Sequence, residues 1–386
     1  MTLHTHSMNA TPTIFFLSLG LVVLDEIPLP GQQPLTNILG GSGAYATLGA
    51  RLFLPTPSSS SIGWMLHVGN DFPENIQEML VKWDVTLYTE TEDEKPSTRG
   101  LLEYSDTTFG PKTFKYTTTP LHVSVDSLEN SFLLASRAFH FLESPQNVTE
   151  RVAELLARRA KFRTSDSREQ EAPLIIWEPA PLACKAENLA ACLRVIQDGI
   201  VDVFSPNHIE LAKIFGEEPT SDKEKIEALA LRILGSSASR KNVDIDSTSN
   251  QSGKGAKPLT LVVRAGEIGC LICTHLTKPT WLPPFYKPGP GGEHNPRVVD
   301  PTGAGNAFLG GYAVGYLDTG GCPLEAACYG TVAASFALEQ VGMPLLEMSV
   351  SLSEEGEWWN GDSVLRRLGE YRRGVSGILR DTTNGI

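Results

Sequence analysis

The sequence of 386 residues is poor in cysteine, has fewer positive than negative charges, and contains no apolar run long enough to cross a bilayer. Its six scattered cysteines, in a chain too large to need disulfide cross-links, indicate a reducing compartment such as the cytoplasm. The 32 Lys and Arg against 45 Asp and Glu give a net charge of −13, which argues against a broad nucleic-acid-binding face. The apolar run Ile14 to Leu24 is too short to span a membrane and is followed directly by Asp25 and Glu26. Neither a nucleic acid nor a membrane is therefore expected as a partner.

The sequence also lacks the ligand spacing of a zinc site. Cys270 and Cys273 have C-x-x-C spacing, but no second pair and no histidine cluster completes the ligand set. The apolar residues between them predict a buried strand, so both cysteines are interpreted as core residues. The first 13 residues lack the basic start and the small-residue cleavage site of a secretory signal, which again favours the cytoplasm.

Apolar, β-branched runs alternate with helix-like segments along most of the chain. Strands are expected at residues 14–24, 138–142, 174–177, 201–204 and 259–263. Apolar residues recur at three- and four-residue spacing, as in helices, at residues 149–162, 187–197 and 226–234. This alternation predicts an α/β fold with a mostly parallel central sheet covered on both faces.

The pattern changes between Trp83 and Thr119 to short segments rich in threonine and aromatic residues. Residues 86–91, 98–104 and 113–117 are interpreted as antiparallel strands of a small accessory sheet. Two polar stretches, residues 164–172 and 235–257, are expected to be flexible surface insertions.

The most informative segment runs from Asp300 to Phe308 and contains Gly303, Ala304 and Gly305 ahead of a helical pattern. Small residues at a helix start let backbone N–H groups converge, and the helix dipole there favours a phosphate or a developing negative charge. The alternative for this segment alone is a glycine-rich turn that binds nothing.

This segment resembles the second signature of the PfkB carbohydrate-kinase family, whose usual form is D-T-x-G-A-G-D ahead of a helix. Six further features agree with that family in order and spacing. They are the strand ending at Asp25, the Gly40-Gly41 turn, a lid at residues 83–119, the N-x-x-E motif at Asn207 and Glu210, the strand and turn from Val263 to Gly269, and a late helix over residues 333–342.

The resemblance covers residues 14–345 and implies a ribokinase-like three-layer α/β/α sandwich with a small antiparallel lid. Residues 346–386 are expected to form a C-terminal helical extension. The resemblance also implies an ATP-dependent kinase for a sugar- or nucleoside-like alcohol, and lids in this family can pair into homodimers.

The resemblance further implies a role for each matching position. Gly303, Ala304 and Gly305 would surround the transferred phosphate, beside the catalytic-base position at residue 306. Asp25, Gly40 and Gly41 would bind the substrate. ATP and Mg²⁺ would be bound with the help of Asn207, Glu210, Gly266 and Gly269, with Glu210 acting on Mg²⁺ indirectly. Arg264, which departs from the family pattern, is a further candidate for nucleotide binding.

Two departures from the family pattern concern the chemistry. Asn306 stands where the family has the Asp that takes a proton from the substrate hydroxyl, and an amide cannot act as a base near neutral pH. Arg264 and Pro301 stand where threonine is common; Arg264 either clamps a nucleotide phosphate or points to solvent. The Asn-bearing variant is similar to a fungal branch, the maintenance-of-killer proteins.

Two classes of function remain open on the sequence: a kinase, slow because of Asn306, and a catalytically silent nucleotide- or sugar-binding protein with an interaction role. A nicotinamide enzyme is disfavoured. The segment Gly41 to Ala46 fits G-x-G-x-x-A, but about fifteen residues with three prolines separate it from the preceding strand.

Overall fold

The structure is a computed structural model. It describes residues 13–28, 33–104, 112–129, 131–162, 171–237, 258–351 and 354–383. The two expected insertions, residues 164–172 and 235–257, lie largely outside the described residues.

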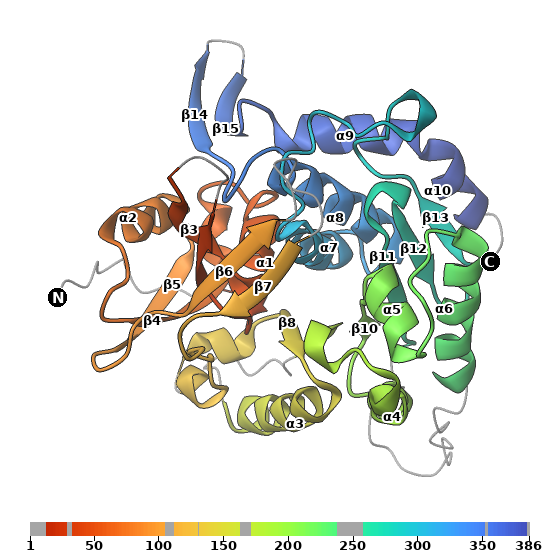
Figure 1. The fold of residues 1–386 in the computed structure, drawn as a ribbon, viewed down its shortest axis with the longest axis horizontal. Helices are drawn as coiled ribbons and strands as arrows, with labels where there is room; N and C mark the ends of the chain where they lie inside the picture. Colours follow the sequence, from red (N-terminus) through yellow and green to blue (C-terminus); the bar gives the residue numbers. More distant parts are fainter. Residues whose placement is uncertain are drawn as a thin grey trace.

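A nine-stranded sheet forms the centre of the molecule (Figure 1). Its strands, in spatial order, are β13 (Thr280–Leu282), β12 (Cys270–Cys273), β11 (Thr260–Arg264), β10 (Val203–Phe204), β9 (Leu174–Pro179), β8 (Ala138–Glu143), β1 (Phe16–Ser18), β4 (Ile62–Gly69) and β5 (Thr86–Glu92). All neighbours from β11 to β5 pair in parallel, and β12 runs antiparallel to both of its neighbours, β11 and β13. The expected mostly parallel sheet is therefore confirmed.

Helices cover both faces of this sheet because its strands are apolar on both sides. Ile176 of β9 belongs to one core and its neighbour Trp177 to the other. The first core is closed by α1 (Ser42–Arg51), α2 (Glu74–Lys82), α7 (Ala304–Asp318) and α8 (Pro323–Ala337). The second is closed by α3 (Pro145–Lys161), α4 (Leu189–Gln197), α5 (His208–Ile214) and α6 (Lys223–Ser237). This arrangement is the expected three-layer sandwich.

A second, four-stranded sheet contains β3 (Leu35–Gly40), β2 (Val23–Ile27), β6 (Arg99–Tyr104) and β7 (Lys112–Tyr116) in that order. Two of its three strand pairs are antiparallel, and β2 pairs with β6 in parallel. We call this sheet the lid.

Two details of the predicted strands are wrong. Residues 14–24 do not form one strand, because the chain leaves the large sheet after Ser18 and enters the lid at Val23. Gly20 packs so closely on the start of α1 that a methyl group there would lie 2.4 Å from Oγ of Ser42. Residues 86–91 belong to the large sheet and not to the lid, since β5 pairs with β4. Because β5 is the edge strand of the large sheet, it is partly exposed and rich in polar residues. This polar composition is the reason it was predicted to be an accessory strand.

The C-terminal part begins with a hairpin, so the expectation of a wholly helical extension is wrong. Strands β14 (Leu346–Ser351) and β15 (Glu354–Trp359) precede α9 (Val364–Gly374) and α10 (Ser376–Thr383), and the hairpin projects from the body in Figure 1. Arg51 of α1, which is fully buried, pairs with Glu357 at 2.6 Å. Buried Trp359 packs edge-on against Trp83. These contacts fasten the extension to the first core.

Cys270 and Cys273 are buried on opposite sides of the large sheet, as core residues. Within the described ranges there is no group of three or more His, Cys, Asp or Glu that could hold a metal ion. None of the helices in the described part of the chain is long and apolar enough to cross a membrane.

Candidate active site

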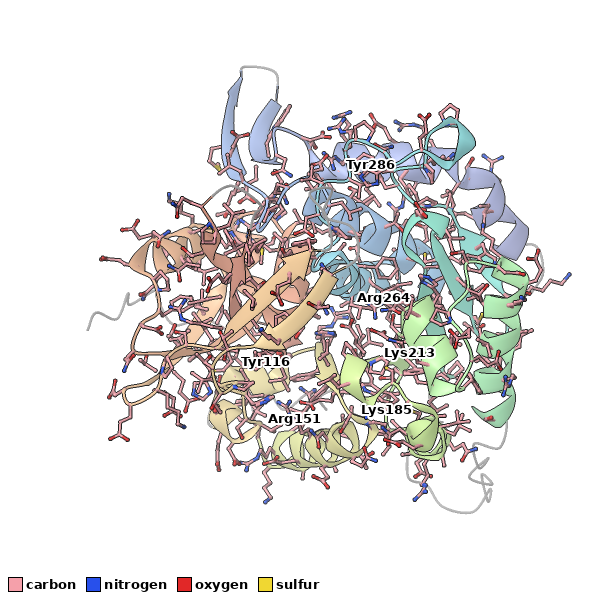
Figure 2. All side chains as sticks on the ribbon, viewed as in Figure 1. Tyr116, Arg151, Lys185, Lys213, Arg264 and Tyr286 are labelled. Atoms are coloured by element: carbon pink, nitrogen blue, oxygen red, sulfur yellow. The ribbon has the colours of Figure 1, made fainter. Side chains whose placement is uncertain are left out.

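A buried network of polar side chains lies near the carboxyl ends of the parallel strands. Ser18 ends β1, Glu178 is the penultimate residue of β9, and Arg264 ends β11. Since parallel strands end at one edge of a sheet, residues far apart in the sequence meet there, and ligands of open α/β sheets bind at this edge. Figure 2 shows Arg264 toward the centre of the molecule.

Glu178 is the hub of this network and is only 5% exposed. Its Oε1 pairs with Nη1 of Arg264 at 2.8 Å, and its Oε2 accepts a hydrogen bond from Nδ2 of Asn306 at 2.5 Å. Nε2 of His140 lies 3.3 Å from the same Oε2, and Nδ1 of His140 lies 3.0 Å from the hydroxyl of Ser18. Burial raises the pKa of Glu178, but Arg264 and His140 outweigh it, so the pKa lies below its usual value. The carboxyl group is therefore ionised near neutral pH.

Arg264 is buried, with 9% exposure, so the alternative that it points to solvent is wrong. Its Nη2 donates to the carbonyl oxygen of Ser205 at 2.8 Å and lies 3.6 Å from Oε2 of Glu210. Its Nε is buried and has no acceptor. The guanidinium lies against the start of α7, where a methyl group built at Gly305 would be 2.2 Å from Nη1.

Asn207 and Glu210 form a capping box at the start of α5. The side chain of Asn207 accepts from the backbone N–H of Glu210, and Oε2 of Glu210 accepts from that of Asn207, both at 2.8 Å. Burial raises the pKa of Glu210 to about 7. The nearby charge of Arg264 lowers this pKa, and that of Glu178 raises it further. Asn207 also makes a β-bridge with Arg264, so the N-x-x-E motif and the end of β11 are in contact.

The turn after β11 carries the next two predicted positions. Gly266 and Gly269 both have positive φ, +55° and +105°. The backbone N–H of Ala265 donates to the carbonyl oxygen of Gly269 at 2.8 Å, which closes the turn beside β13.

Helix α7 begins at the predicted glycine-rich segment. Gly303 caps it with φ +74°, a left-handed conformation that suits glycine. A methyl group on Gly303 would overlap the ring of Tyr45 at 2.1 Å. The first turn contains no acidic residue of its own, and the backbone N–H of Ala304 donates weakly to the carbonyl oxygen of Pro301 at 3.4 Å. A helix start of this kind favours an anion.

A second buried cluster lies under the lid. Asp25 of β2 is 4% exposed, and its Oδ1 has no hydrogen-bond partner. Gly40 and Gly100 make room for the carboxyl group, because methyl groups there would lie 2.1 and 2.9 Å from its oxygens. Burial raises the pKa of Asp25 to about 7, with Lys112 opposing the shift and Asp300 adding to it. Gly41 follows with φ +93° and starts α1.

Two lid residues reach the segment that leads into α7. The hydroxyl of Tyr104 donates to Oδ1 of Asp300 at 2.9 Å. Nζ of Lys112 lies 3.7 Å from the same oxygen and hydrogen-bonds to Oγ1 of Thr302. Asp300 also accepts from the backbone N–H of Thr302 at 2.9 Å. The lid and the start of α7 are thus joined directly.

The structure therefore arranges the predicted residues in two clusters joined by residues 302–306. One cluster holds Asn207, Glu210, Arg264 and Asn306, and the other holds Asp25 and Gly40. Functional roles for Glu178, His140, Lys112 and Tyr104, and the contacts of Asp300, were not predicted from the sequence. For Glu178 a signal existed, since it is a charged residue at the end of the apolar strand 174–177. For Lys112 there was none.

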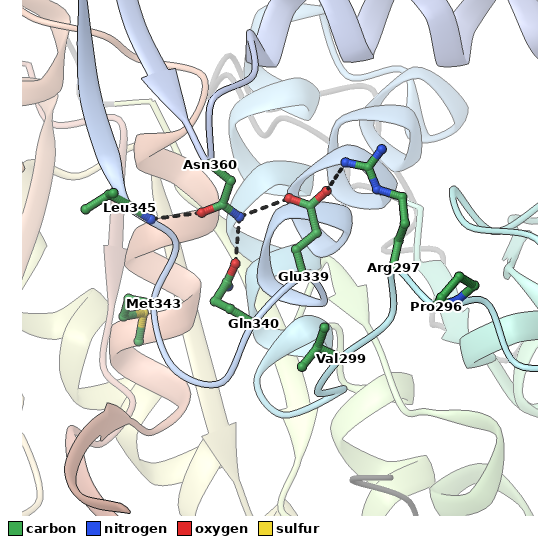
Figure 3. Close-up of a pocket in the computed structure, with 8 residues that line it drawn as sticks. All are labelled: Pro296, Arg297, Val299, Glu339, Gln340, Met343, Leu345 and Asn360. Atoms are coloured by element: carbon green, nitrogen blue, oxygen red, sulfur yellow. Dashed lines mark hydrogen bonds and ion pairs between the residues drawn. The ribbon is translucent and has the colours of Figure 1, made fainter.

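A cavity of about 440 Å³ lies beside these clusters, between residues 296–299 and 339–345 (Figure 3). Asn360 donates to Glu339 at 2.9 Å and to Gln340 at 2.6 Å, and Arg297 pairs with Glu339 at 3.3 Å. These polar groups satisfy one another. The backbone N–H of Val299 bonds to the carbonyl oxygen of Leu338 at 2.7 Å, so the cavity walls also hold the segment that ends at Asp300.

Comparison with known proteins identifies relatives of this chain. Residues 31–345 match a family model described as pfkB family carbohydrate kinase. The chain is 30% identical over 370 residues to an uncharacterized protein of Schizosaccharomyces pombe, with 92% of each covered. It is 27% identical over 370 residues to Protein MAK32 of Saccharomyces cerevisiae, with 91% of this chain and 90% of MAK32 covered. Ribokinase from Giardia lamblia has a similar structure, with a TM-score of 0.60 at 17% identity, and 86% of this chain and 96% of the ribokinase are covered. The expected ribokinase-like fold and fungal relatives are confirmed.

Proposed function

The chain belongs to the pfkB family of carbohydrate kinases. We therefore propose that it is an ATP-dependent phosphotransferase, slowed by Asn306, that acts on an alcohol group of a sugar- or nucleoside-like substrate. The observation that carries the proposal is the position of residues 302–306 between two buried clusters. Thr302 contacts the cluster under the lid, and Asn306 contacts the cluster at the ends of the parallel strands. A phosphate at the start of α7 would lie between an alcohol on one side and the rest of a nucleotide on the other.

The alcohol is assigned to the cluster under the lid. Oδ1 of Asp25 is a buried acceptor without a partner, and leaving such a group unpaired is costly. A substrate hydroxyl would supply the missing hydrogen bond. Gly40 and Gly41 would let the substrate approach the backbone, as the family resemblance implies.

The nucleotide is assigned to the side of Arg264. Backbone N–H groups of Gly303, Ala304 and Gly305 would face the transferred phosphate. Arg264 would contribute its unpaired Nε to a phosphate oxygen. Gly266 and Gly269 would lie along the remaining phosphates, as the resemblance implies.

The family resemblance implies ATP with Mg²⁺, and such an ion would neutralise charge on the transferred phosphate. The residues present fit indirect binding. Oε2 of Glu210 already accepts from Asn207 and faces Arg264, and no three-ligand cluster occurs in the described ranges. Mg²⁺ characteristically keeps several waters and binds substrate phosphates. Glu210 would hold the ion through water.

Asn306 makes the proposed reaction slow but does not exclude it. General base catalysis contributes about 10²- to 10⁴-fold, whereas positioning and electrostatic stabilisation carry most of phosphoryl transfer. The Nδ2 of Asn306 is directed to Glu178, which turns its Oδ1 away from that carboxylate. This oxygen would orient a substrate hydroxyl without removing its proton.

A second candidate is a catalytically silent nucleotide- or sugar-binding protein with an interaction role. It is favoured by the ion pair of Glu178 and Arg264, which lies against the α7 start where the phosphate would bind. In that case ligand binding persists and no transfer follows.

The proposal is tested by calorimetry with Mg²⁺–ATP on the wild type and on Gly305→Val. The added side chain enters the space beside Arg264 and should weaken binding by about tenfold or more. Gly235→Val is the matched control, since a methyl group there meets nothing within 4 Å. Unchanged affinity in Gly305→Val would show that ATP is not bound at this helix start. A thermal-shift panel of sugars and nucleosides then identifies the alcohol, and ADP release with both ligands bound separates the kinase from the silent binding protein.

A further inference from the structure

Glu178 is the group that the proposed reaction does not use. It places a full negative charge against the first turn of α7, where its Oε2 accepts from the side chain of Asn306. A carboxylate near a helix start has the same favourable interaction with the helix dipole as a bound phosphate. The chain therefore carries its own anion at the predicted phosphate site.

The same carboxylate also engages the nearby cation. Nη1 of Arg264 is 2.8 Å from Oε1 of Glu178, which neutralises the guanidinium in the ligand-free protein. Nε of Arg264 remains buried and without an acceptor. Arg264 therefore has one donor left that an oxygen of an incoming anion could satisfy.

The geometry sets the two anions in competition. Arg264 lies directly beside Gly305, so a phosphate at the α7 start would contact its guanidinium. Glu178 is within hydrogen-bonding distance of both Arg264 and Asn306. A bound phosphate would therefore compete with the Glu178 carboxylate for the N–H groups of these two side chains. Two like charges sharing buried donors repel strongly at such separations.

We propose that Glu178 is an internal competitor of phosphate: it holds Arg264 and Asn306 in the free protein and thereby sets a low affinity for phosphate-bearing ligands at the start of α7. This rests on the proposed function in one respect, that the α7 start is the phosphate site. The ligand class is a polyphosphate such as the triphosphate of Mg²⁺–ATP, whose several charges compete with one carboxylate better than a monophosphate does.

The test compares the wild type with Glu178→Gln by calorimetry, using Mg²⁺–ATP and inorganic pyrophosphate as probes. The amide keeps the shape of the side chain but removes the charge, which leaves Arg264 available to phosphate. Both probes should bind at least about tenfold more tightly, as expected when a charge-assisted pair is gained. Glu217→Gln is the matched control, because Glu217 pairs with Arg232 at an exposed site, and the loss of this pair should not change either affinity.

A buried arginine without its partner can prevent folding, so a second variant keeps the test decisive. Glu178→Gln with Arg264→Gln removes both charges and leaves none unpaired. If Glu178 opposes the phosphate, this double variant should bind Mg²⁺–ATP about tenfold more tightly than Arg264→Gln alone, in which the carboxylate remains without its cation.

The outcomes separate the inference from the proposed function. If Gly305→Val weakens Mg²⁺–ATP binding but Glu178→Gln does not strengthen it, the site stands and the competition is wrong. A double variant that binds no more tightly than Arg264→Gln alone would likewise overturn it, since Glu178 would then not oppose binding. If neither the wild type nor any variant binds either probe, both proposals are wrong.

Discussion

Replacing Asn306 by aspartate tests the geometry of the candidate site most directly. On the sequence alone this change would restore the family's base and raise the rate by about 10²-fold. In the structure the side-chain amide of Asn306 donates to Glu178 at 2.5 Å. A carboxylate at residue 306 cannot donate unless it is protonated, so Asn306→Asp places two carboxylates in contact.

The cost follows from the distance and the burial. Two unit charges 4 Å apart repel by about 4 kcal/mol at an effective dielectric constant of 20, and Arg264 offsets part of this. The pair avoids the repulsion by sharing a proton, which raises its apparent pKa. A rise of about two pH units corresponds to a loss of about 2.7 kcal/mol of unfolding free energy at a pH above both values.

The sign of the pH dependence is fixed by this shift. Because the folded protein holds the shared proton more tightly than the unfolded chain, Asn306→Asp should cost little near pH 4. The cost should grow as the pH rises through the raised pKa and reach about 2 to 3 kcal/mol by pH 8. Urea unfolding of the wild type and the variant at pH 4 and pH 8 measures the difference.

The double variant Asn306→Asp with Glu178→Gln is the matched control. It keeps one negative charge beside Arg264, and the glutamine amide can donate to the new carboxylate, so the stability lost at pH 8 should largely return. Only this double variant should also show the gain in phosphoryl transfer, once a binding alcohol is known. If Asn306→Asp is as stable as the wild type at both pH values, the contact with Glu178 is wrong.

Two further predictions concern single buried charges. Asp25→Asn should abolish alcohol binding and yet stabilise the protein by about 2 to 4 kcal/mol at pH 8, with little effect at pH 4. The reason is that burial raises the pKa of Asp25 to about 7, so the wild type loses stability as the pH rises toward and through that value. Thermal unfolding at both pH values measures this, and a variant no more stable than the wild type at pH 8 would contradict it. Arg51→Met should destabilise the protein by about 3 to 5 kcal/mol, because it leaves Glu357 without its partner. Arg366→Met is the control at an exposed ion pair and should cost less than about 1 kcal/mol. Equal losses of unfolding free energy in urea would refute the anchoring role of Arg51.

Features that depend on a few neighbouring residues could be predicted from the amino-acid sequence. The spacing of Asn207 and Glu210 specifies a capping box, because the two side chains satisfy each other's backbone within one helical turn. Gly303 is required where α7 starts in a left-handed conformation. Alternating apolar segments gave the layered α/β fold, since each strand and helix must bury its apolar face.

Which charged side chains meet depends on how the whole chain folds and could not be predicted from local sequence. Glu178, Arg264 and Asn306 come from two strands and a helix start that are distant in the sequence, and their pairing depends on the order of strands in the sheet. The same holds for Lys112, which reaches Asp300 because β7 lies in the lid. The pKa of Asp25 depends on how completely the lid buries it. Coulomb energies and burial depend on distances through space. Residue spacing along the chain therefore predicted the capping box and the glycine-rich helix start, but not the ion pairs and pKa values of the site.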